Sequence, residues 1–211
     1  MSNLFELVNS VADGDVSKAG ELTRKALDAQ ISAKEILDNG LLPAMDKVGS
    51  SFEKGEIFLP ELLMAGDAMK ATLELLRPEL SKEGASYAGK YAIGTVQGDL
   101  HDIGKNIVIL MLQGNGWDVV DLGIDVSPEQ FCEVIAKGDF DILGLSALLT
   151  FTMPQMAETI SALKAAGLRD RVKVMLGGAP VTQSFADKIE ADAYARDAVE
   201  AVAKAKTLVS K

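Results

Sequence analysis

The sequence of 211 residues contains one histidine, His101, and one cysteine, Cys132. A protein zinc site usually draws on several His and Cys ligands, so these counts argue against one. A Ser-His-Asp hydrolase would have to use His101 as its base. Asp99 stands two residues before His101, close enough to orient an imidazole that binds a metal. A planar macrocycle that supplies four equatorial nitrogens needs only one axial ligand from the protein, so one histidine is compatible with that kind of metal site.

His101 lies in a polar segment, residues 97–106, which also contains Gly98 and Gly104. Glycine at these two positions leaves room for another group to approach the backbone. The alternative is a polar turn whose histidine caps the following helix. The choice between these interpretations depends on where the segment lies in the fold.

The second part of the chain alternates between short apolar segments of β character and helical segments. The expected strands are residues 91–96, 117–122, 141–146, 172–176 and 191–194. Five βα units predict an α/β domain with a doubly wound, flavodoxin-like parallel sheet of Rossmann type. Ligands of such sheets bind at the carboxyl ends of the strands. The loops 97–104, 146–153 and 177–181 are therefore the expected site.

The first part of the chain, residues 1–82, has helical periodicity throughout and predicts a bundle of four or five helices. The pair Asn39–Gly40 indicates a helix end, and the last helix is expected to end near Pro78. Small and polar residues at 83–90 predict a linker. The domains are therefore expected at 1–82 and 91–211.

Composition restricts the partners. The chain has 31 acidic and 21 basic residues, a net charge of -10, so no nucleic-acid partner is expected. It is 48% apolar and 25% charged, which is typical of a globular protein. No apolar run reaches the roughly 18 residues of a membrane span, and the N-terminus lacks the pattern of a signal peptide. We expect a cytoplasmic protein without a membrane partner.

The string Asp99-x-His101-x-x-Gly104 resembles the D-x-H-x-x-G motif of cobalamin-binding domains. In that family the histidine replaces the dimethylbenzimidazole of the cofactor as the lower cobalt ligand. The resemblance implies that His101 is the lower axial ligand of cobalt, and residues 98–108 resemble the methyltransferase branch in particular. The residues that it places against the cofactor in this loop are Gly98, Asp99, Leu100, His101, Asp102, Ile103 and Gly104.

Ser146 and Leu148 resemble the S-x-L of the same family, in the segment that lines the cavity for the displaced nucleotide tail. Taken alone, Ser146 could equally end a strand and cap the next helix. Thr150 follows, and Thr152 falls where the family has a hydroxyl, often serine, that is hydrogen-bonded to the aspartate. The resemblance therefore implies a chain from His101 through its aspartate to Thr152.

Gly177 and Gly178 match the G-G pair that lets the nucleotide tail approach the backbone, although a simple turn is the alternative. A β-carbon at Gly178 is expected to intrude on that tail and to leave the fold intact. Tyr194 matches the segment near the buried benzimidazole. Arg196 stands where many relatives carry proline.

Residues 49–63 resemble the helical cap over the upper face of the corrin in methionine synthase and methanogenic corrinoid proteins. Phe52 and Leu59 match the apolar residues that cover the upper cobalt ligand there. As sequence alone, both are compatible with ordinary bundle core, and Phe58 competes for the same role.

The family implies a corrinoid protein that carries a methyl group on cobalt, as cobalamin or a related corrinoid alternating between Co(I) and methyl-Co(III). A substrate-specific methyltransferase would supply the methyl group, and a second would pass it to tetrahydrofolate or coenzyme M. A reductive activator of the corrinoid is a further implied partner. No catalytic residue for a substrate is apparent, which fits a carrier that is not an enzyme by itself. The methyl donor stays open among methylamines, methanol, quaternary amines and methoxylated aromatics.

Three alternatives to a methyl-carrying corrinoid protein stay open. The small subunit of an adenosylcobalamin-dependent mutase has the same motif, but mutases place a barrel over the corrin and have no use for a helical cap. A cobalamin-binding regulatory module would need a DNA-binding domain, for which neither length nor basic charge is available. A flavodoxin- or receiver-like protein without cobalt is the third.

Overall fold

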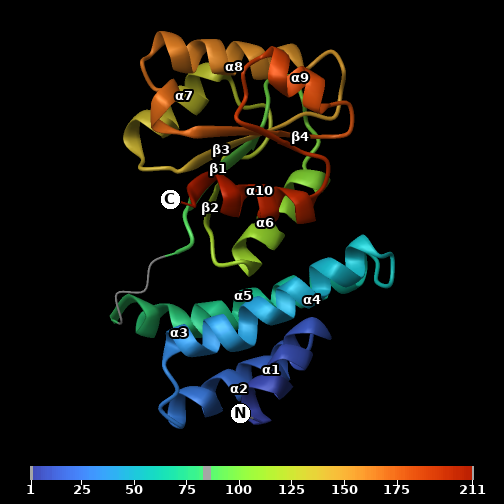
Figure 1. The fold of residues 1–211 in the computed structure, drawn as a ribbon, viewed down its shortest axis with the longest axis vertical. Coiled ribbons are helices and arrows are strands. Elements are labelled where there is room, and N and C mark those ends of the chain that lie inside the picture. The colour runs from blue at the N-terminus through green and yellow to red at the C-terminus, as the bar shows by residue number, and fades with distance from the viewer. Residues whose placement is uncertain (1, 83–86, 211) are drawn as a thin grey trace. The chain divides into compact units, whose positions relative to one another are not determined.

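The structure, a computed structural model, describes residues 2–82 and 87–210 (Figure 1). The chain divides into two compact units, a helical unit up to Tyr87 and an α/β unit from Ala88 onward. This division falls inside the linker predicted at 83–90, of which residues 83–86 lie outside the described residues.

The helical unit contains α1 (Ser2–Ala12), α2 (Val16–Asp28), α3 (Ala33–Ile36), the π-helical segment η1 (Leu37–Leu41), α4 (Leu42–Glu53) and α5 (Leu59–Lys82). The bundle predicted for this part of the chain is confirmed. Apolar residues at helical spacing face inward, which is the arrangement that stabilises short helices packed together. Fully buried members are Leu7, Val11, Ile36, Leu41, Met45, Leu62 and Leu76.

Two predicted helix ends in this unit are wrong. The chain does not stop at Gly40 but continues through η1 into α4, and a β-carbon at Gly40 would lie 3.0 Å from Cδ2 of Leu7. The glycine therefore serves close packing against α1 and is not a cap. Pro78 lies inside α5, which runs on to Lys82. The carbonyl that loses its helical partner there belongs to Glu74, an exposed residue where water can replace the bond.

The α/β unit contains a sheet of five parallel strands in the order β2-β1-β3-β4-β5, as the alternation of elements predicted. The strands are β1 (Lys90–Thr95), β2 (Asp118–Asp121), β3 (Ile142–Ser146), β4 (Lys173–Gly177) and β5 (Ala193–Ala195). The helices are α6 (Ile103–Gly114), α7 (Pro128–Lys137), α8 (Pro154–Ala165), α9 (Gln183–Lys188) and α10 (Ala198–Val209), with the 3-10 turn η2 (Arg169–Arg171).

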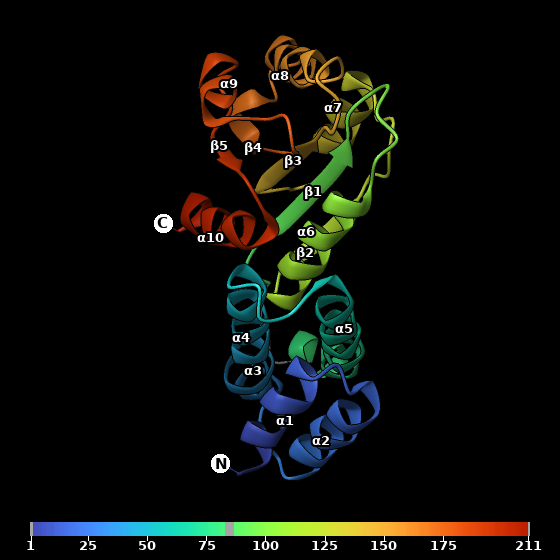
Figure 2. The same ribbon diagram turned by 90° about the vertical axis from the view of Figure 1, so that its right-hand side faces the viewer.

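Helices cover both faces of this sheet. In two views at right angles, α6 and α10 lie on one face and α7, α8 and α9 on the other (Figures 1 and 2). The central strands β1, β3 and β4 are buried on both sides and read as nearly continuous apolar segments, which is typical of parallel sheets. Among residues 2–82 and 87–210, none of the helices combines the length and apolar character that a membrane span requires.

Candidate functional site at the carboxyl ends of β1, β3 and β4

The register of the sheet brings the three predicted loops to one level. Thr95 of β1 pairs with Ser146 of β3, and Ser146 pairs with Gly177 of β4. Each of these residues ends its strand, so the loops 97–104, 146–153 and 177–181 begin side by side. The strand order reverses between β1 and β3, which is where open α/β sheets bind ligands.

The side chain of Asp99 is completely buried and links the first two loops. Its Oδ2 accepts hydrogen bonds from the backbone N–H of Leu148 at 2.8 Å, the backbone N–H of Leu149 at 3.2 Å and the Thr152 hydroxyl at 2.7 Å. The hydrogen bond expected between Thr152 and Asp99 is therefore confirmed. The three donors follow β3, about 50 residues along the chain from Asp99.

The other oxygen of Asp99 faces His101. Oδ1 accepts from the backbone N–H of His101 at 3.2 Å and lies 3.1 Å from its Nδ1. Burial opposes the charged form of this carboxyl, but its hydrogen bonds to Leu148, Thr152 and His101 lower its pKa from 3.8 to about 2.

Because an ionised carboxylate only accepts hydrogen bonds, Nδ1 of His101 is the donor in this pair, and in a neutral imidazole the lone pair then lies on Nε2. The imidazole is 53% exposed. It is thus oriented from one side and accessible from the other, which is the arrangement of a metal-binding histidine. Within the described residues, no cluster of three or more His, Cys, Asp or Glu side chains could hold a metal ion, so a bound group would have to supply the remaining ligands.

Large apolar side chains on the two loops that Asp99 joins stay exposed. Leu100 and Ile103, on the loop of His101, are 67% and 68% exposed, and Leu148 and Phe151, on the loop after β3, are 41% and 73% exposed. Exposed apolar side chains gathered on neighbouring loops mark a binding surface. These side chains fit a ligand with a large apolar surface. Sequence reasoning missed Phe151, because one aromatic residue in a loop carries no spacing signal.

Gly104 has no structural need to be glycine. It lies in the first turn of α6, and a β-carbon added to it would meet no atom within 4 Å. Glycine in a helix costs about 0.5–1 kcal/mol relative to alanine. The free space beside Gly104 therefore fits the approach of a bound group. Asp102, also exposed, accepts a hydrogen bond from Nδ2 of Asn106 at 3.2 Å.

The expectation for Gly178 is wrong where it concerns the fold. Gly178 has a φ of +124°, and its β-carbon would lie 1.8 Å from the carbonyl oxygen of Ala147. It must be glycine because the turn after β4 packs against the backbone that follows β3. Gly177 is different, since its β-carbon would meet only the carbonyl oxygen of Ala195 at 3.6 Å.

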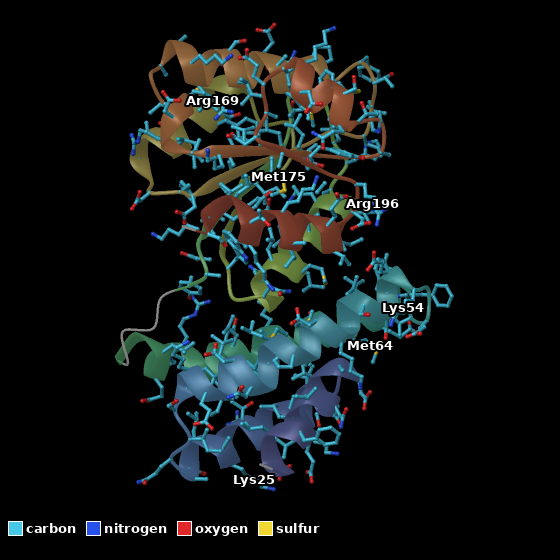
Figure 3. All side chains as sticks on the ribbon, in the orientation of Figure 1. Lys25, Lys54, Met64, Arg169, Met175 and Arg196 are labelled. Atoms are coloured by element: carbon cyan, nitrogen blue, oxygen red, sulfur yellow. The ribbon has the colours of Figure 1, made fainter. Side chains whose placement is uncertain are left out.

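The other residues predicted near the nucleotide tail lie at the same edge of the sheet. Ser146 ends β3 and is partly buried, Thr150 is exposed in the following loop, and Tyr194 in β5 is partly buried. Arg196 stands just before α10 (Figure 3), and its Nε lies 3.0 Å from Oδ2 of Asp197. Arg196 therefore forms an ion pair at the start of α10.

Sequence reasoning also missed the residues that shape the main chain of this loop. The Thr95 hydroxyl donates to the carbonyl oxygen of His101 at 2.8 Å. The backbone N–H of Gly98, which has a φ of +79°, donates to Oδ1 of Asp125 at 2.7 Å. Asp125 follows β2 and is 27 residues from Gly98, so no local pattern could have connected them.

The helical unit carries the predicted cap residues at the turn between α4 and α5. Phe52 near the end of α4 and Leu59 at the start of α5 are partly buried. Phe58 between them is 68% exposed, and Met64 (Figure 3) is 52% exposed. Exposure therefore makes Phe58 as strong a candidate for ligand contact as Phe52.

A doubly wound parallel sheet with an aspartate-oriented histidine at its switch point, preceded by a helical bundle, defines the class of corrinoid-binding proteins. Residues 89–203 match a family model described as B12 binding domain, and residues 4–77 match a second model with the same description. The chain belongs to the corrinoid proteins of methyltransferase systems, and it binds cobalamin or a related cobalt-containing corrinoid.

Three relatives illustrate this membership. The chain is 45% identical to dimethylamine corrinoid protein 3 of Methanosarcina acetivorans, over 99% of this chain and 100% of the relative. A crystal structure of a cobalamin-binding protein from Desulfitobacterium hafniense is 34% identical with a TM-score of 0.81 and 98% of each chain covered. The methanol:cobalamin methyltransferase complex of Methanosarcina barkeri contains a chain 29% identical, with a TM-score of 0.87, covering 100% of this chain and 81% of that one. These comparisons give no support to the mutase alternative.

The buried carboxylate of Asp99 predicts a pH dependence of the cofactor-free protein. Its pKa is about 2 in the fold, below the ordinary 3.8, so its stabilising contribution is complete above about pH 4 and is lost as the pH falls toward 2. This contribution amounts to about 2 kcal/mol. We expect Asp99→Asn to reduce the acid-induced loss of unfolding free energy by about that amount, measured by urea unfolding at several pH values between these limits.

The control for that experiment is Asp102→Asn, which changes an exposed aspartate of the same loop. It is expected to keep the acid dependence of the unsubstituted protein. Equal acid dependence in all three proteins would contradict the prediction that the buried carboxylate of Asp99 is ionised in the fold.

Replacing Gly104 with alanine is expected to change the stability of the protein and its affinity for cobalamin in opposite directions. Gly104→Ala is expected to raise the unfolding free energy of the cofactor-free protein by about 0.5–1 kcal/mol, since the methyl group meets no atom. It should weaken cobalamin binding about tenfold if the ring uses that space. Binding is measured by visible absorption, and Gly20→Ala in α2, where the added carbon makes ordinary contacts, is the control. Unchanged affinity would show that the cofactor does not occupy the space beside Gly104.

Proposed function

We propose that this protein carries a methyl group between two methyltransferases, on the cobalt of a corrinoid bound at the switch point with His101 as lower axial ligand. The observation that carries the proposal is the buried carboxylate of Asp99, which orients the only histidine of the chain from its Nδ1 side. When bound, the corrinoid supplies a cobalt centre that accepts and donates methyl groups. The protein supplies ligation, orientation and exclusion of water.

His101 and Asp99 form a hydrogen-bonded pair, which suits a histidine that has to bind a metal and be released from it. Nδ1–H donates to Asp99 while Nε2 presents its lone pair to the metal. An imidazole released from the metal would be free to bind a proton at Nε2, and the adjacent ionised Asp99 would stabilise the positive charge. Thr152 and the N–H groups after β3 keep Asp99 in place during this exchange.

The nucleotide tail is proposed to run along the carboxyl ends of β3, β4 and β5. Ser146, Leu148 and Thr150 would line one side of it, and Gly177 and Tyr194 the other. Gly178 would contribute its partly buried backbone, because any side chain there meets Ala147. The level register of Ser146, Gly177 and Ala195 across these strands supports the proposal.

The proposed partners are a substrate-specific methyltransferase, a second methyltransferase acting on tetrahydrofolate or coenzyme M, and a reductive activator of the corrinoid. The relatives point to more than one donor, since one is named for dimethylamine and another belongs to a methanol-specific complex. The choice of donor is therefore assigned to the partner enzyme. The chain itself acts as a carrier.

The helical unit is proposed to cover the upper face of the corrin through apolar side chains at the α4–α5 turn. Phe52 and Leu59 are assigned this role by their place in the family pattern. Phe58 is retained as a competitor because its ring is 68% exposed. An apolar cover of this kind excludes water from a reactive metal centre, and it has to move when a methyltransferase approaches.

The histidine assignment predicts a spectroscopic signature. In the Co(II) form, a nitrogen ligand splits the electron paramagnetic resonance lines, and the cofactor's own base would do so as well. Labelling the single histidine with nitrogen-15 distinguishes them, because it converts each triplet into a doublet only if His101 is the ligand. We expect that conversion, and we expect His101→Ala to lose the splitting by protein nitrogen. Splitting that does not respond to the label would overturn the assignment.

The proposed apolar cover predicts different photolysis rates for alanine variants of two phenylalanines. Phe52→Ala is expected to leave cobalamin affinity nearly unchanged but to speed photolysis of bound methylcobalamin several-fold, because solvent reaches the cobalt. Phe58→Ala is the matched comparison on the same turn. A change confined to Phe58→Ala would move the role from Phe52 to Phe58. Photolysis rates unchanged in both variants would refute the proposed cover.

A further inference from the structure

Asp125 has a backbone conformation that needs an explanation. It lies in the loop between β2 and α7 with a φ of +54°. Among the described residues, only Gln30 and Glu190 are other non-glycine residues with a positive φ. Such a conformation costs free energy of order 1 kcal/mol, although aspartate tolerates it better than most side chains.

Two hydrogen bonds join Asp125 to the loop that carries the histidine. Its Oδ1 accepts from the backbone N–H of Gly98 at 2.7 Å. Its own backbone N–H donates to the carbonyl oxygen of Asp99 at 3.1 Å. Asp125 therefore binds both ends of the Gly98–Asp99 dipeptide, with its side chain on one end and its main chain on the other.

The loop that presents Asp125 is itself anchored to β1. The backbone N–H of Thr95 donates to the carbonyl oxygen of Gly123 at 3.0 Å, and that of Val126 donates to the carbonyl oxygen of Thr95 at 3.0 Å. At its start, Asp121 accepts from the buried ammonium of Lys105 at 2.6 Å and from the backbone N–H of Gly123 at 2.9 Å. Asp125 is thus held on a fixed support.

Different neighbours hold the two parts of Asp99. The residues after β3 bind its carboxylate through Oδ2, while Asp125 binds its main chain. The position of Oδ1, which meets Nδ1 of His101, depends on both. The main chain of this loop is also held by the backbone N–H of Asp99, which donates to the carbonyl oxygen of Val96 at 3.1 Å, and by the Thr95 hydroxyl at His101. Asp125 adds the contacts that hold the Gly98–Asp99 dipeptide from the loop after β2, and so contributes to the direction of the imidazole.

We propose that Asp125 is a positioning residue for the corrinoid site, which holds Gly98 and Asp99 so that Asp99 orients the imidazole of His101. This inference rests on the proposed function of His101 as cobalt ligand. Asp125 is exposed, so its substitution opens no core. Its side chain acts through the bond from Gly98, while its backbone bond to Asp99 does not depend on the side chain.

The test compares variants that keep or remove the carboxylate oxygen. Asp125→Gly removes the acceptor but suits the positive φ. Asp125→Asn keeps an acceptor oxygen and also tolerates that conformation. Asp125→Ala removes the acceptor without adding glycine flexibility, so agreement between the glycine and alanine variants assigns the effect to the lost bond. Glu190→Gly is the matched control, because Glu190 has a φ of +61° but precedes β5 at the opposite edge of the sheet.

The first measurement needs no cofactor. At a pH about two units above the ordinary imidazole value of about 6.5, nitrogen-15 shifts of the single histidine report which ring nitrogen carries the proton. We expect the Nδ1–H form in the unsubstituted protein, in Asp125→Asn and in Glu190→Gly. The glycine and alanine variants should show a mixture of both forms, because Oδ1 of Asp99 no longer meets Nδ1 reliably.

The second measurement uses the Co(II) corrinoid protein with nitrogen-15 histidine. Some Co(II) centres show lines split by the histidine nitrogen and others do not. The ratio of unsplit to split centres should rise about fivefold in the glycine and alanine variants and return to the original value in Asp125→Asn. Unchanged tautomer and unchanged ratio in both deletion variants would overturn the role of Asp125. If the unsubstituted protein shows no histidine splitting, the assignment of His101 as cobalt ligand is refuted instead. The tautomer measurement would still decide whether Asp125 positions Asp99 and His101.

Discussion

The arrangement of the site depends on one buried carboxylate. The side chain of Asp99 is completely buried, yet its ionised form is favoured because the fold directs hydrogen-bond donors to both of its oxygens. One oxygen ties the loop after β1 to the loop after β3, and the other orients His101. A buried charge without these donors would be costly. The same interaction thus joins two loops across the switch point and prepares the histidine.

Two glycines of this region have different roles, one in the packing of the fold and one in the site. Gly178 is required by close backbone contact with Ala147, so its absence of a side chain is a property of the scaffold. Gly104 faces free space in a helix that would favour alanine. A residue that is unfavourable for the fold and has no packing reason indicates a functional constraint. This contrast supports the proposal that the cofactor lies beside the start of α6, next to the loop of His101.

A carrier protein needs precise ligation and access in the same place. The rigid part of the site lies below the imidazole, where strand ends and hydrogen bonds hold the loop. The apolar side chains of Leu100, Ile103 and Phe151 stay exposed around it. Under the proposed function this surface faces the corrinoid, and the chemistry then belongs to the cofactor and the partner enzymes.

The sequence by itself determined the α/β class, the strand segments and the pair of Asp99 and His101, because periodicity and motif spacing are local properties of a chain. The Thr152 hydrogen bond was also predictable, through the resemblance and not through spacing. Only the tertiary structure decided that η1 joins α3 to α4, that Gly178 serves packing, and that Asp125 and Phe151 belong to the site. Their roles arise from the register of parallel strands, which brings residues 27 to 53 positions apart into hydrogen-bonding distance. No local pattern encodes such a distance, since it depends on how every intervening element packs.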